Sequence, residues 1–463
     1  MKVVMLLGNK NSDIKKRVQV VASSGNLSRA NGTVTEVIKK NSSYESNLKL
    51  ARIVVGYGHK SISEHDYLVF AIENVTPIVE QILISYRLTS FTIKSRRNVD
   101  FRNVGFYVPI FMDKDSNVLS NNKKLQNKYK KYMKDLFLKY GNLVDKKLPI
   151  EDARYILPYS YYSNIIMGCD ANELLKITSD MLYGKISRIS EVNELGKKFA
   201  MIIKENVPYL YKALENENMD CYLDKFSYLD DEFKLSSSLV KESRLVNYTN
   251  NSDEIVLSSI LINRYQMDYN TSRKIIDGMD KDLELKLMDS LKNSKNNREL
   301  EQVIFSFETS ISLAVLTHIT RHRMHSLLIP DFVPLWNLDN YVIPNSLKEY
   351  ESKYREIFAN NKKIVDEFKS YGVRDEDLVY FYLSGNSCNI FTTMNARSLC
   401  WISKMRCCNK AQWEIRKIVN KWVSDVKSVS PLIGGLLGPT CVTMGYCPEG
   451  KDSCKNRGVV IKN

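Results

Sequence analysis

The sequence predicts an α+β protein in which one fold occurs twice, because three pairs of short segments recur in the same order. The members of each pair lie about 225 to 236 residues apart. The pairs are Ser85-Tyr86-Arg87 with Arg321-His322-Arg323, Tyr107-Val108-Pro109 with Val342-Ile343-Pro344, and Asp170-Ala171-Asn172 with Asn395-Ala396-Arg397. Internal similarity at a nearly fixed offset indicates two consecutive copies of one domain.

Each copy shows the same order of expected elements: a helical N-terminal part, then strands, then amphipathic helices. The apolar segments Tyr67 to Ile72 and Val303 to Phe307 predict the clearest strands. Tyr107 to Pro109 and Val342 to Pro344 each predict a strand that ends at proline. The apolar run at the N-terminus is too short for a secretory signal, so it predicts a first buried strand.

The length of 463 residues also exceeds one ordinary domain core. We place the boundary near residue 240, after the acidic, polar stretch Asp230 to Glu232, where Val246-Asn247-Tyr248-Thr249 opens the second copy. The predicted domains are therefore residues 1–240 and 241–463.

The composition is typical of a globular protein, with 44% hydrophobic and 26% charged residues. The net charge of +14 is spread over both halves, and its densest run, Lys123 to Lys147, carries apolar residues at helical spacing. We interpret this run as a helix with a solvated basic face. The alternative, an RNA-binding surface, lacks aromatic residues interleaved at stacking positions.

The remaining composition predicts a cytoplasmic protein without a membrane or nucleic-acid partner. Ser428 to Pro448 is uncharged, but its prolines and glycines break any membrane-spanning helix, so we expect a packed loop. Nine cysteines without an export signal indicate reduced thiols. Cys441, Cys447 and Cys454 lack paired Cys-x-x-Cys spacing, so we expect no metal, with a zinc site there as the alternative.

The five histidines fall in two short windows, His59 and His65 in the first half and His318, His322 and His325 in the second. His318 and His322 are four residues apart and could share a helix face as metal ligands. However, Arg321 and Arg323 would place two positive charges beside any cation. We therefore expect an anion site, in which the arginine forks suit a nucleotide phosphate, with a surface arginine pair as the alternative.

Two further segments carry arginines. Ser95-Arg96-Arg97 lies in a turn-like stretch and could hold a phosphate through a hydroxyl and two guanidinium groups. Asn395 and Arg406 are eleven residues apart, which places them on one helix face. Between them lie four apolar residues that we assign mainly to the core: Leu399, Trp401, Ile402 and Met405.

Several common catalytic motifs are absent from the sequence. There is no phosphate loop, and Gly56-Tyr57-Gly58 lacks the third glycine of a dinucleotide fingerprint. No sequence element supplies an activated serine, and no cysteine adjoins a histidine. Covalent catalysis by the protein is therefore not indicated.

Together these segments resemble the flavin-dependent thymidylate synthase family. In the second half the similar segments are Arg321-His322-Arg323, Asn395 to Leu399, Arg406 and Ala411 to Ile415. In the first half they are Gly58 to His65, Ser95-Arg96-Arg97 and Arg154 to Pro158. The resemblance implies that each half is an antiparallel sheet flanked by helices, with a helical lobe.

The family builds its nucleotide pocket across two subunits. In this chain each half keeps the residues that one of those two subunits contributes. The first half keeps Ser95, Arg97 and Arg154, but has Ser85-Tyr86-Arg87, Asp170, Asn172 and Met181 where the family has its other site residues. The second half keeps Arg321, His322, Arg323, Asn395, Arg397 and Arg406, but has Ile329 to Val333 for the Ser-x-Arg loop and Val379 for the middle arginine. Three further positions depart from the family pattern: Ile93, His318 and Lys410.

The resemblance implies reductive methylation of dUMP to dTMP, with methylene-tetrahydrofolate as carbon donor, FAD as hydride carrier and NADPH as reductant. Arg406 would be the catalytic residue, because it would stabilise the negative charge that develops at N3 of the uracil ring. The implied dUMP ligands are Ser95, Arg96, Arg97, Arg154, His318, Arg321 and Arg406. The implied FAD ligands are His59, Ser61, Glu64, Arg321, His322, Arg323, Asn395 and Arg397.

Since family members are homotetramers, a duplicated chain would form a homodimer with two competent sites and two dead ones. The competent site could form within one chain or between chains, and the folate site is not fixed by the sequence. The alternative function is that of a catalytically dead pseudoenzyme, which would bind nucleotide or flavin as a sensor or scaffold.

Overall fold

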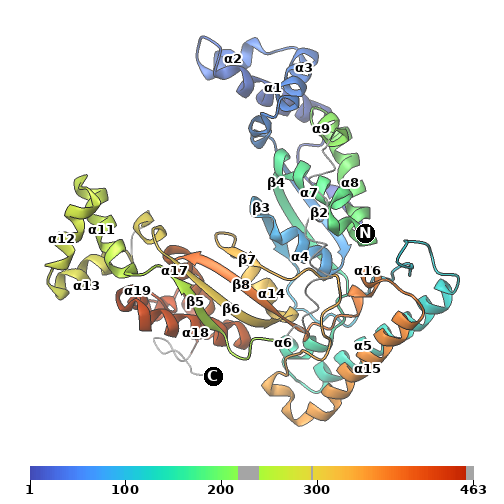
Figure 1. Cartoon of the computed structure of the whole chain (residues 1–463). Coiled ribbons are helices and arrows are strands. Elements are labelled where there is room, and N and C mark those ends of the chain that lie inside the picture. Colours follow the sequence, from blue (N-terminus) through green and yellow to red (C-terminus); the bar gives the residue numbers. More distant parts are fainter. Residues whose placement is uncertain (217–238, 293–295, 455–463) are drawn as a thin grey trace. The chain divides into compact units, whose positions relative to one another are not determined.

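The computed structural model describes residues 1–216, 239–292 and 296–454 (Figure 1). It confirms the α+β fold class and the repetition, because it contains two four-stranded antiparallel sheets of the same strand order. The chain divides into two compact units. The described residues of the first unit are 1–216, 332–339 and 343–384, and those of the second are 239–292, 296–331, 340–342 and 385–454.

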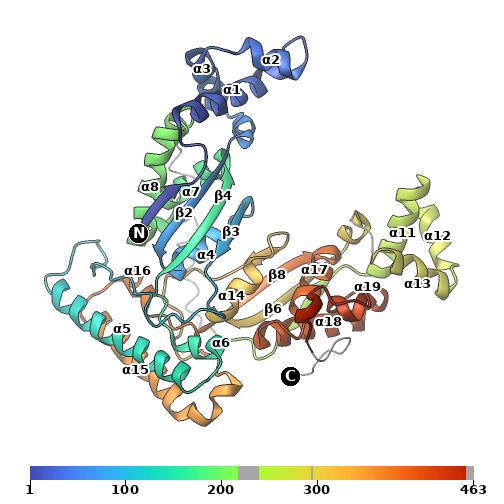
Figure 2. The ribbon, with the colours of Figure 1, turned by 180° about the vertical axis from the view of Figure 1, so that it is seen from behind.

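The first unit holds the sheet β1-β2-β4-β3. Its strands are β1 (Lys2–Met5), β2 (Tyr67–Val75), β3 (Thr89–Ile93) and β4 (Ser163–Asp170). Along β2, Leu68, Phe70 and Ile72 are fully buried, as the alternating pattern predicts. Helices α7 (Ala171–Tyr183) and α8 (Ser190–Asn206) accompany this sheet (Figure 2), and the ring of Phe199 from α8 lies 5.5 Å from that of Phe70.

The second unit holds the sheet β5-β6-β8-β7. Its strands are β5 (Arg244–Tyr248), β6 (Ile304–Ser312), β7 (Ser326–Leu328) and β8 (Ser387–Asn395). Helices α17 (Ala396–Arg406) and α18 (Trp413–Val429) follow β8. Trp422 of α18 stacks on Phe307 of β6 at 4.8 Å, which anchors the helix to the sheet.

Shorter helices complete both units. In the first they are α1 (Asn11–Leu27), α2 (Val34–Lys40), α3 (Tyr44–Gly56), η1 (Lys60–His65), α4 (Pro77–Ser85), α6 (Ile150–Ala153), η2 (Arg154–Ile156), η3 (Lys185–Arg188), α9 (Tyr211–Glu215), η6 (Asn345–Tyr350), α16 (Asp375–Leu378) and η7 (Val379–Phe381). In the second they are α11 (Ser252–Tyr265), α12 (Tyr269–Asp277), α13 (Lys281–Ser290), η5 (Arg298–Glu301), α14 (Leu313–Thr320), α19 (Pro431–Gly435), α20 (Thr440–Thr443) and η8 (Gly450–Asp452).

The same hydrogen bonds recur in both copies. At the start of α4, the backbone N and Oγ1 of Thr76 donate to Glu191 at 2.9 and 2.7 Å. At the start of α14, the backbone N and Oγ of Ser312 donate to Glu414, both at 2.7 Å. In each copy a buried carboxylate satisfies donors at a helix N-terminus. The repeat is therefore present in the polar interior as well as in the strand order.

Two long helices of the first unit come from different halves of the sequence. Helix α5 (Asn122–Asp145) confirms the helix predicted from the basic run, and α15 (Glu351–Ser370) lies beside it in both views (Figures 1 and 2). The hydroxyl of Tyr132 on α5 donates to Asn361 on α15 at 3.0 Å. The helical lobe thus joins a segment of each half in one core.

Reciprocal hydrogen bonds extend this junction. The backbone N of Tyr159 donates to the carbonyl of Tyr382 at 2.7 Å, and the backbone N of Ser384 donates to the carbonyl of Leu157 at 2.8 Å. These residues correspond at the offset of about 225, so the two segments are related by a local two-fold axis. Residues 343–384 therefore belong to the first compact unit, although the predicted boundary near residue 240 places them in the second half. Asp230 to Glu232, near that boundary, lies outside the described residues.

Two expectations about secondary structure are wrong. Tyr107 to Pro109 and Val342 to Pro344 form no strands; each is preceded by an isolated bridge, at Phe106 and at Tyr341 respectively. Pairing stops after one residue because the partner segments continue by bonding to each other, from Tyr159 to Tyr382 and from Ser384 to Leu157. The expected loop from Ser428 to Pro448 contains α19, which begins at Pro431, and α20. No helix in the described part of the chain is long and apolar enough to cross a membrane.

Candidate functional site

The loop after β3 carries Ser95, Arg96 and Arg97, and its two arginines have different surroundings. Arg96 is 7% exposed, and its Nη1 donates to Glu80 and to the hydroxyl of Tyr161, both at 2.6 Å. Burial alone would lower the pKa of Arg96, but the carboxylate of Glu80 raises it above its usual value. Arg96 therefore holds the loop against the core. The sequence had grouped this residue with the predicted dUMP ligands.

Arg97 and Arg154 are brought together by Glu151. Nε of Arg97 lies 2.6 Å from the carboxylate of Glu151, and Nε of Arg154 donates to the backbone carbonyl of the same residue at 3.0 Å. Ser95 is half-buried two residues before Arg97. The structure thus brings Arg97 and Arg154, two of the residues that the resemblance assigned to dUMP, to the same residue, Glu151.

Arg154 is only 3% exposed, yet its Nη2 atom has no hydrogen-bond partner among the described residues. Burial lowers the pKa of Arg154, and the positive charge of Arg96 lowers it further. A buried guanidinium atom without an acceptor is costly, so such groups are nearly always satisfied. An anionic ligand at this position would supply the missing acceptor.

The corresponding region of the second copy is filled by aromatic rings. Phe332 replaces the loop arginine and stacks on Trp336 at 5.3 Å. Trp336 lies 4.9 Å from Tyr382, whose hydroxyl accepts from the backbone N of Trp336 at 2.7 Å. Val379, which replaces the middle arginine, is fully buried. This cluster offers no guanidinium to an anion.

In the second unit, Arg406 contacts His322. Nε of Arg406, the last residue of α17, donates to Nε2 of His322 at 3.0 Å. Burial, then Arg406 and then His325, lower the pKa of His322 to about 3. The imidazole is therefore neutral at physiological pH, and its Nε2 lone pair accepts from the guanidinium. His322 thereby orients Arg406.

The other residues around His322 lie at the end of α14. Arg321 and Arg323 are exposed, whereas His318 on the last turn of α14 is half-buried. His325 is buried, and its Nδ1 lies 2.7 Å from the hydroxyl of Thr392. Helix α14 fixes the position of His318 and of the residues that follow the helix, because every residue of α14 except His318 is buried.

In the first copy, a different pair occupies the place of His322 and Arg406. Tyr86 corresponds to His322, and its hydroxyl donates to Asp180 at 2.7 Å. Met181 corresponds to Arg406 and is fully buried. Neither the carboxylate of Asp180 nor the side chain of Met181 can stabilise an anion, so the first copy lacks the cationic group that the second retains.

The residues expected for flavin lie on both copies. His59, Ser61 and Glu64 are exposed on or next to η1. In the second unit, Oδ1 of Asn395 accepts from the backbone N of Ser398 at 2.8 Å, which caps α17. Arg397 forms an ion pair with Glu301. In the first copy a hydrogen bond takes the place of this ion pair, because the amide of Asn172 donates to Glu64 at 3.4 Å.

The expectation that the apolar residues of α17 are mainly core is half wrong. Leu399 and Ile402 are buried, but Trp401 is 62% exposed and Met405 is 48% exposed. The reason is geometric, because Leu399 and Ile402 share the face of α17 that meets the core, whereas Trp401 and Met405 share a different face.

Sequence reasoning missed two carboxylates that organise the loop. Glu151 precedes Arg154 by three residues, a spacing that places both side chains on one turn. Glu80 lies within the apolar run of α4 and is fully buried, which requires a buried cation nearby. That second signal could have indicated an internal partner for one arginine of the loop.

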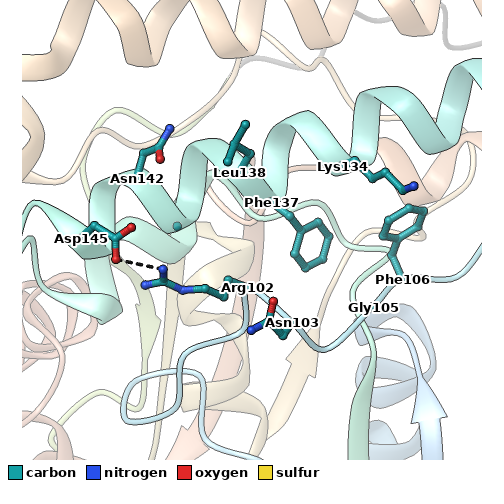
Figure 3. A pocket seen from close by; sticks show the side chains of 10 residues that line it. Arg102, Asn103, Gly105, Phe106, Lys134, Phe137, Leu138, Asn142 and Asp145 are labelled. Atoms are coloured by element: carbon teal, nitrogen blue, oxygen red, sulfur yellow. Dashed lines mark ion pairs between the residues drawn. The ribbon is translucent and has the colours of Figure 1, made fainter.

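A pocket of about 440 Å³ lies against α5 (Figure 3), but it does not contain the predicted site. Arg102, one of its charged residues, is paired with Asp145 at 2.9 Å and with Asp100 at 2.6 Å. Apolar rings, among them Phe106 and Phe137, form one wall. None of the residues predicted to bind dUMP or FAD lines this pocket.

Comparison with known proteins identifies the family. The model of the family described as "Thymidylate synthase complementing protein" matches residues 11–209 and 244–432. The flavin-dependent thymidylate synthase of Clostridium tetani is 31% identical over 238 residues, which cover 46% of this chain and 92% of that protein. The enzyme of the same name from Thermococcus onnurineus is 31% identical over 221 residues, covering 45% and 89%.

Two solved structures are similar over about half of the chain. The UMP/dUMP methylase PolB of Streptomyces cacaoi, bound with 5-Br dUMP, shares 15% identity with a TM-score of 0.35 and covers 44% of this chain and 96% of its own. Thymidylate synthase X of Helicobacter pylori, with FAD and dUMP, shares 17% identity with a TM-score of 0.34 and covers 47% and 100%. Since the family model matches most of both halves, the chain belongs to the thymidylate synthase complementing protein family, that of the flavin-dependent thymidylate synthases.

Proposed function

We propose that this protein converts dUMP to dTMP by reductive methylation, with methylene-tetrahydrofolate as carbon donor, FAD as hydride carrier and NADPH as reductant. Membership of the family supports the reaction class. The observation that carries the proposal for this chain is the complementary retention of site residues, with Ser95, Arg97 and Arg154 in one half and His322 and Arg406 in the other.

In this proposal, the first-half residues clamp the nucleotide phosphate. The buried Nη2 of Arg154 supports this role, because a phosphate oxygen would satisfy it with a charge-assisted hydrogen bond. Arg97 and Ser95 would add a second guanidinium and a hydroxyl. The contact of Arg96 with Glu80 would keep the loop in place, so Arg96 acts as a positioning residue.

Arg406 is the proposed catalytic residue. Its guanidinium would stabilise negative charge at N3 of the uracil ring, which activates C5 without a protein nucleophile. The neutral imidazole of His322 would fix the direction of the guanidinium by accepting from Nε. Arg321 and His318 would complete the nucleotide contacts.

The donor set also suits FAD. Guanidinium groups match a pyrophosphate, and hydroxyl, imidazole and carboxylate groups match ribose and adenine. The proposed ligands are His59, Ser61, Glu64, Arg321, His322, Arg323, Asn395 and Arg397. FAD, when bound, supplies the redox chemistry, and the protein supplies binding and orientation.

Each half lacks what the other keeps, so we propose one type of composite site to which both halves contribute residues. By analogy with the tetrameric family, the chain would assemble as a homodimer with two such sites. Neither half would be active alone.

The test is conversion of dUMP by the purified full-length protein. We expect a yellow protein whose flavin absorbance bleaches with NADPH in the presence of dUMP, and dTMP formation that is lost in both Arg154→Ala and Arg406→Ala. Lys363→Met, an exposed change on α15, is the control and should retain activity. Turnover by Arg406→Ala at the wild-type rate would remove that residue from its proposed role.

A pseudoenzyme that binds nucleotide or flavin is the second candidate, motivated by Ile93 and His318 at positions where the family has other residues. It predicts bound flavin or dUMP affinity without dTMP formation under any condition of the same assay. A colourless protein that takes up no FAD would contradict both the synthase and a flavin-binding pseudoenzyme.

A further inference from the structure

A second cavity, of about 270 Å³, lies where α5 meets η6 and α15 in the first compact unit. Its apolar wall includes Leu143, Ile156 and Ile357. An apolar cavity of about 150 Å³ can hold benzene in another protein, so this space has room for a ring and an attached polar group. None of the residues proposed to bind dUMP or FAD lines it.

The local two-fold relation shows that this cavity is not required by the backbone. Helices α5 and α15 end alike: the backbone N of Leu148 donates to Leu143, and that of Val373 donates to Phe368, both at 3.3 Å. Lys147 and Gly372 follow the two helices with positive φ angles of 61° and 80°. Leu143 therefore corresponds to Phe368.

The same offset pairs Ile156 with Phe381 and Ile357 with Tyr132. On that side of the axis the rings fill the space, with Phe368 at 5.0 Å and Tyr132 at 6.3 Å from Phe381. The cavity exists because smaller aliphatic side chains stand at the equivalent positions. An empty apolar cavity lowers stability, and an apolar pocket with a few polar groups at its edge is the usual form of a small-molecule site.

The rim of the cavity is basic. Lys139, Lys146 and Lys353 line it, against one acidic residue of the described lining, Glu356. Lys139 pairs with Asp135 at 2.8 Å. Lys146 lies 4.8 Å over the ring of Tyr350, and neither it nor Lys353 has an ion-pair partner within the described part of the chain. The rim therefore carries positive charge beside an apolar interior.

We propose that this cavity binds a small organic anion with an apolar body, which is a ring or short chain bearing a carboxylate or phosphate. The body fills the space that Phe368 and Phe381 fill on the other side of the axis. The acidic group lies at the rim, where Lys146 and Lys353 attract it as point charges. This site is independent of the proposed dUMP and FAD ligands.

The test is a ligand-observed NMR titration of the full-length protein with 4-phenylbutyrate, phenyl phosphate and the neutral 4-phenylbutyramide. We expect both acids to bind about tenfold more tightly than the amide. The double change Leu143→Phe and Ile156→Phe, which copies the other side of the axis, should weaken binding of the acids at least about tenfold. Ile357→Tyr is a second filling variant that makes the same prediction if the double variant does not fold.

Charge and control variants complete the experiment. Lys146→Met with Lys353→Met should remove the preference for acid over amide, whereas Lys363→Met on the same helix should preserve it. The proposal is overturned if the wild-type protein binds neither acid at millimolar concentration, or shows no preference over the amide. Undiminished binding in both folded filling variants would also overturn it.

Discussion

Arg154 and Arg96 are both buried arginines, and the structure predicts opposite effects when each is replaced by methionine. Nη2 of Arg154 lacks an acceptor, and an unsatisfied buried polar group costs about 1–3 kcal/mol. Arg154→Met should therefore raise the free energy of unfolding of the nucleotide-free protein by about 1 kcal/mol or more, which corresponds to about 2–4 °C in Tm per kcal/mol. Arg96→Met should destabilise it by about 3–5 kcal/mol, because it leaves the carboxylate of Glu80 buried without its cation.

Bound dUMP should reverse the effect of Arg154→Met, because the nucleotide would give Nη2 its missing acceptor. A hydrogen bond from a charged group contributes about 1.5–3 kcal/mol, so Arg154→Met should weaken dUMP binding by about 10- to 150-fold. Thermal unfolding with and without dUMP measures both effects, since a ligand that binds the folded state raises Tm. Addition of dUMP should raise the Tm of the wild-type protein more than that of the variant. A variant that is less stable without dUMP, or that gains as much from dUMP as the wild type, would refute the reasoning.

Three further predictions concern other buried groups. Burial raises the pKa of Glu191 to about 7, so the contribution of its protonated form to the free energy of unfolding is present below pH 4.5 and is lost as the pH rises towards 7. Glu191→Gln should therefore reduce the difference between the free energies of unfolding measured in urea at pH 5 and at pH 8. A variant with the same difference as the wild type would contradict the assignment. The pKa of His322 is about 3, so its imidazole NMR signals should not titrate between pH 5 and 8, and a midpoint near 6 would be incompatible with the Arg406 contact. Phe381→Ala should destabilise the helical lobe by about 3–5 kcal/mol in denaturant unfolding, because the ring of Phe381 packs against those of Tyr129, Tyr132 and Phe368. A loss of stability below about 1 kcal/mol would argue against this aromatic core.

Local patterns predicted much of the fold. Segments at a nearly constant offset indicated the duplication, and helical spacing of apolar residues located α5 to within a few residues. The position of Ser95, Arg96 and Arg97 on a loop was also predictable, because turn-forming polar residues follow an apolar strand. These features depend on residues close together in the sequence.

Features set by distant residues were not predictable in the same way. Arg96 and Arg97 are adjacent, and Arg96 faces inward because its partners, Glu80 and Tyr161, lie 16 and 65 residues away in the sequence. The packing of α15 on α5 joins residues more than 200 positions apart, such as Tyr132 and Asn361. No periodicity in either helix specifies that pairing, since an apolar face indicates burial but not the partner.

The central claim is that the two halves share one type of site, and the stoichiometry of dUMP tests it most directly. Calorimetric titration of the flavin-loaded protein should give one dUMP per chain, and either Arg154→Ala or Arg406→Ala alone should abolish or strongly weaken that binding. Two dUMP molecules per chain, or one dUMP whose binding depends on residues of only one half, would contradict the account.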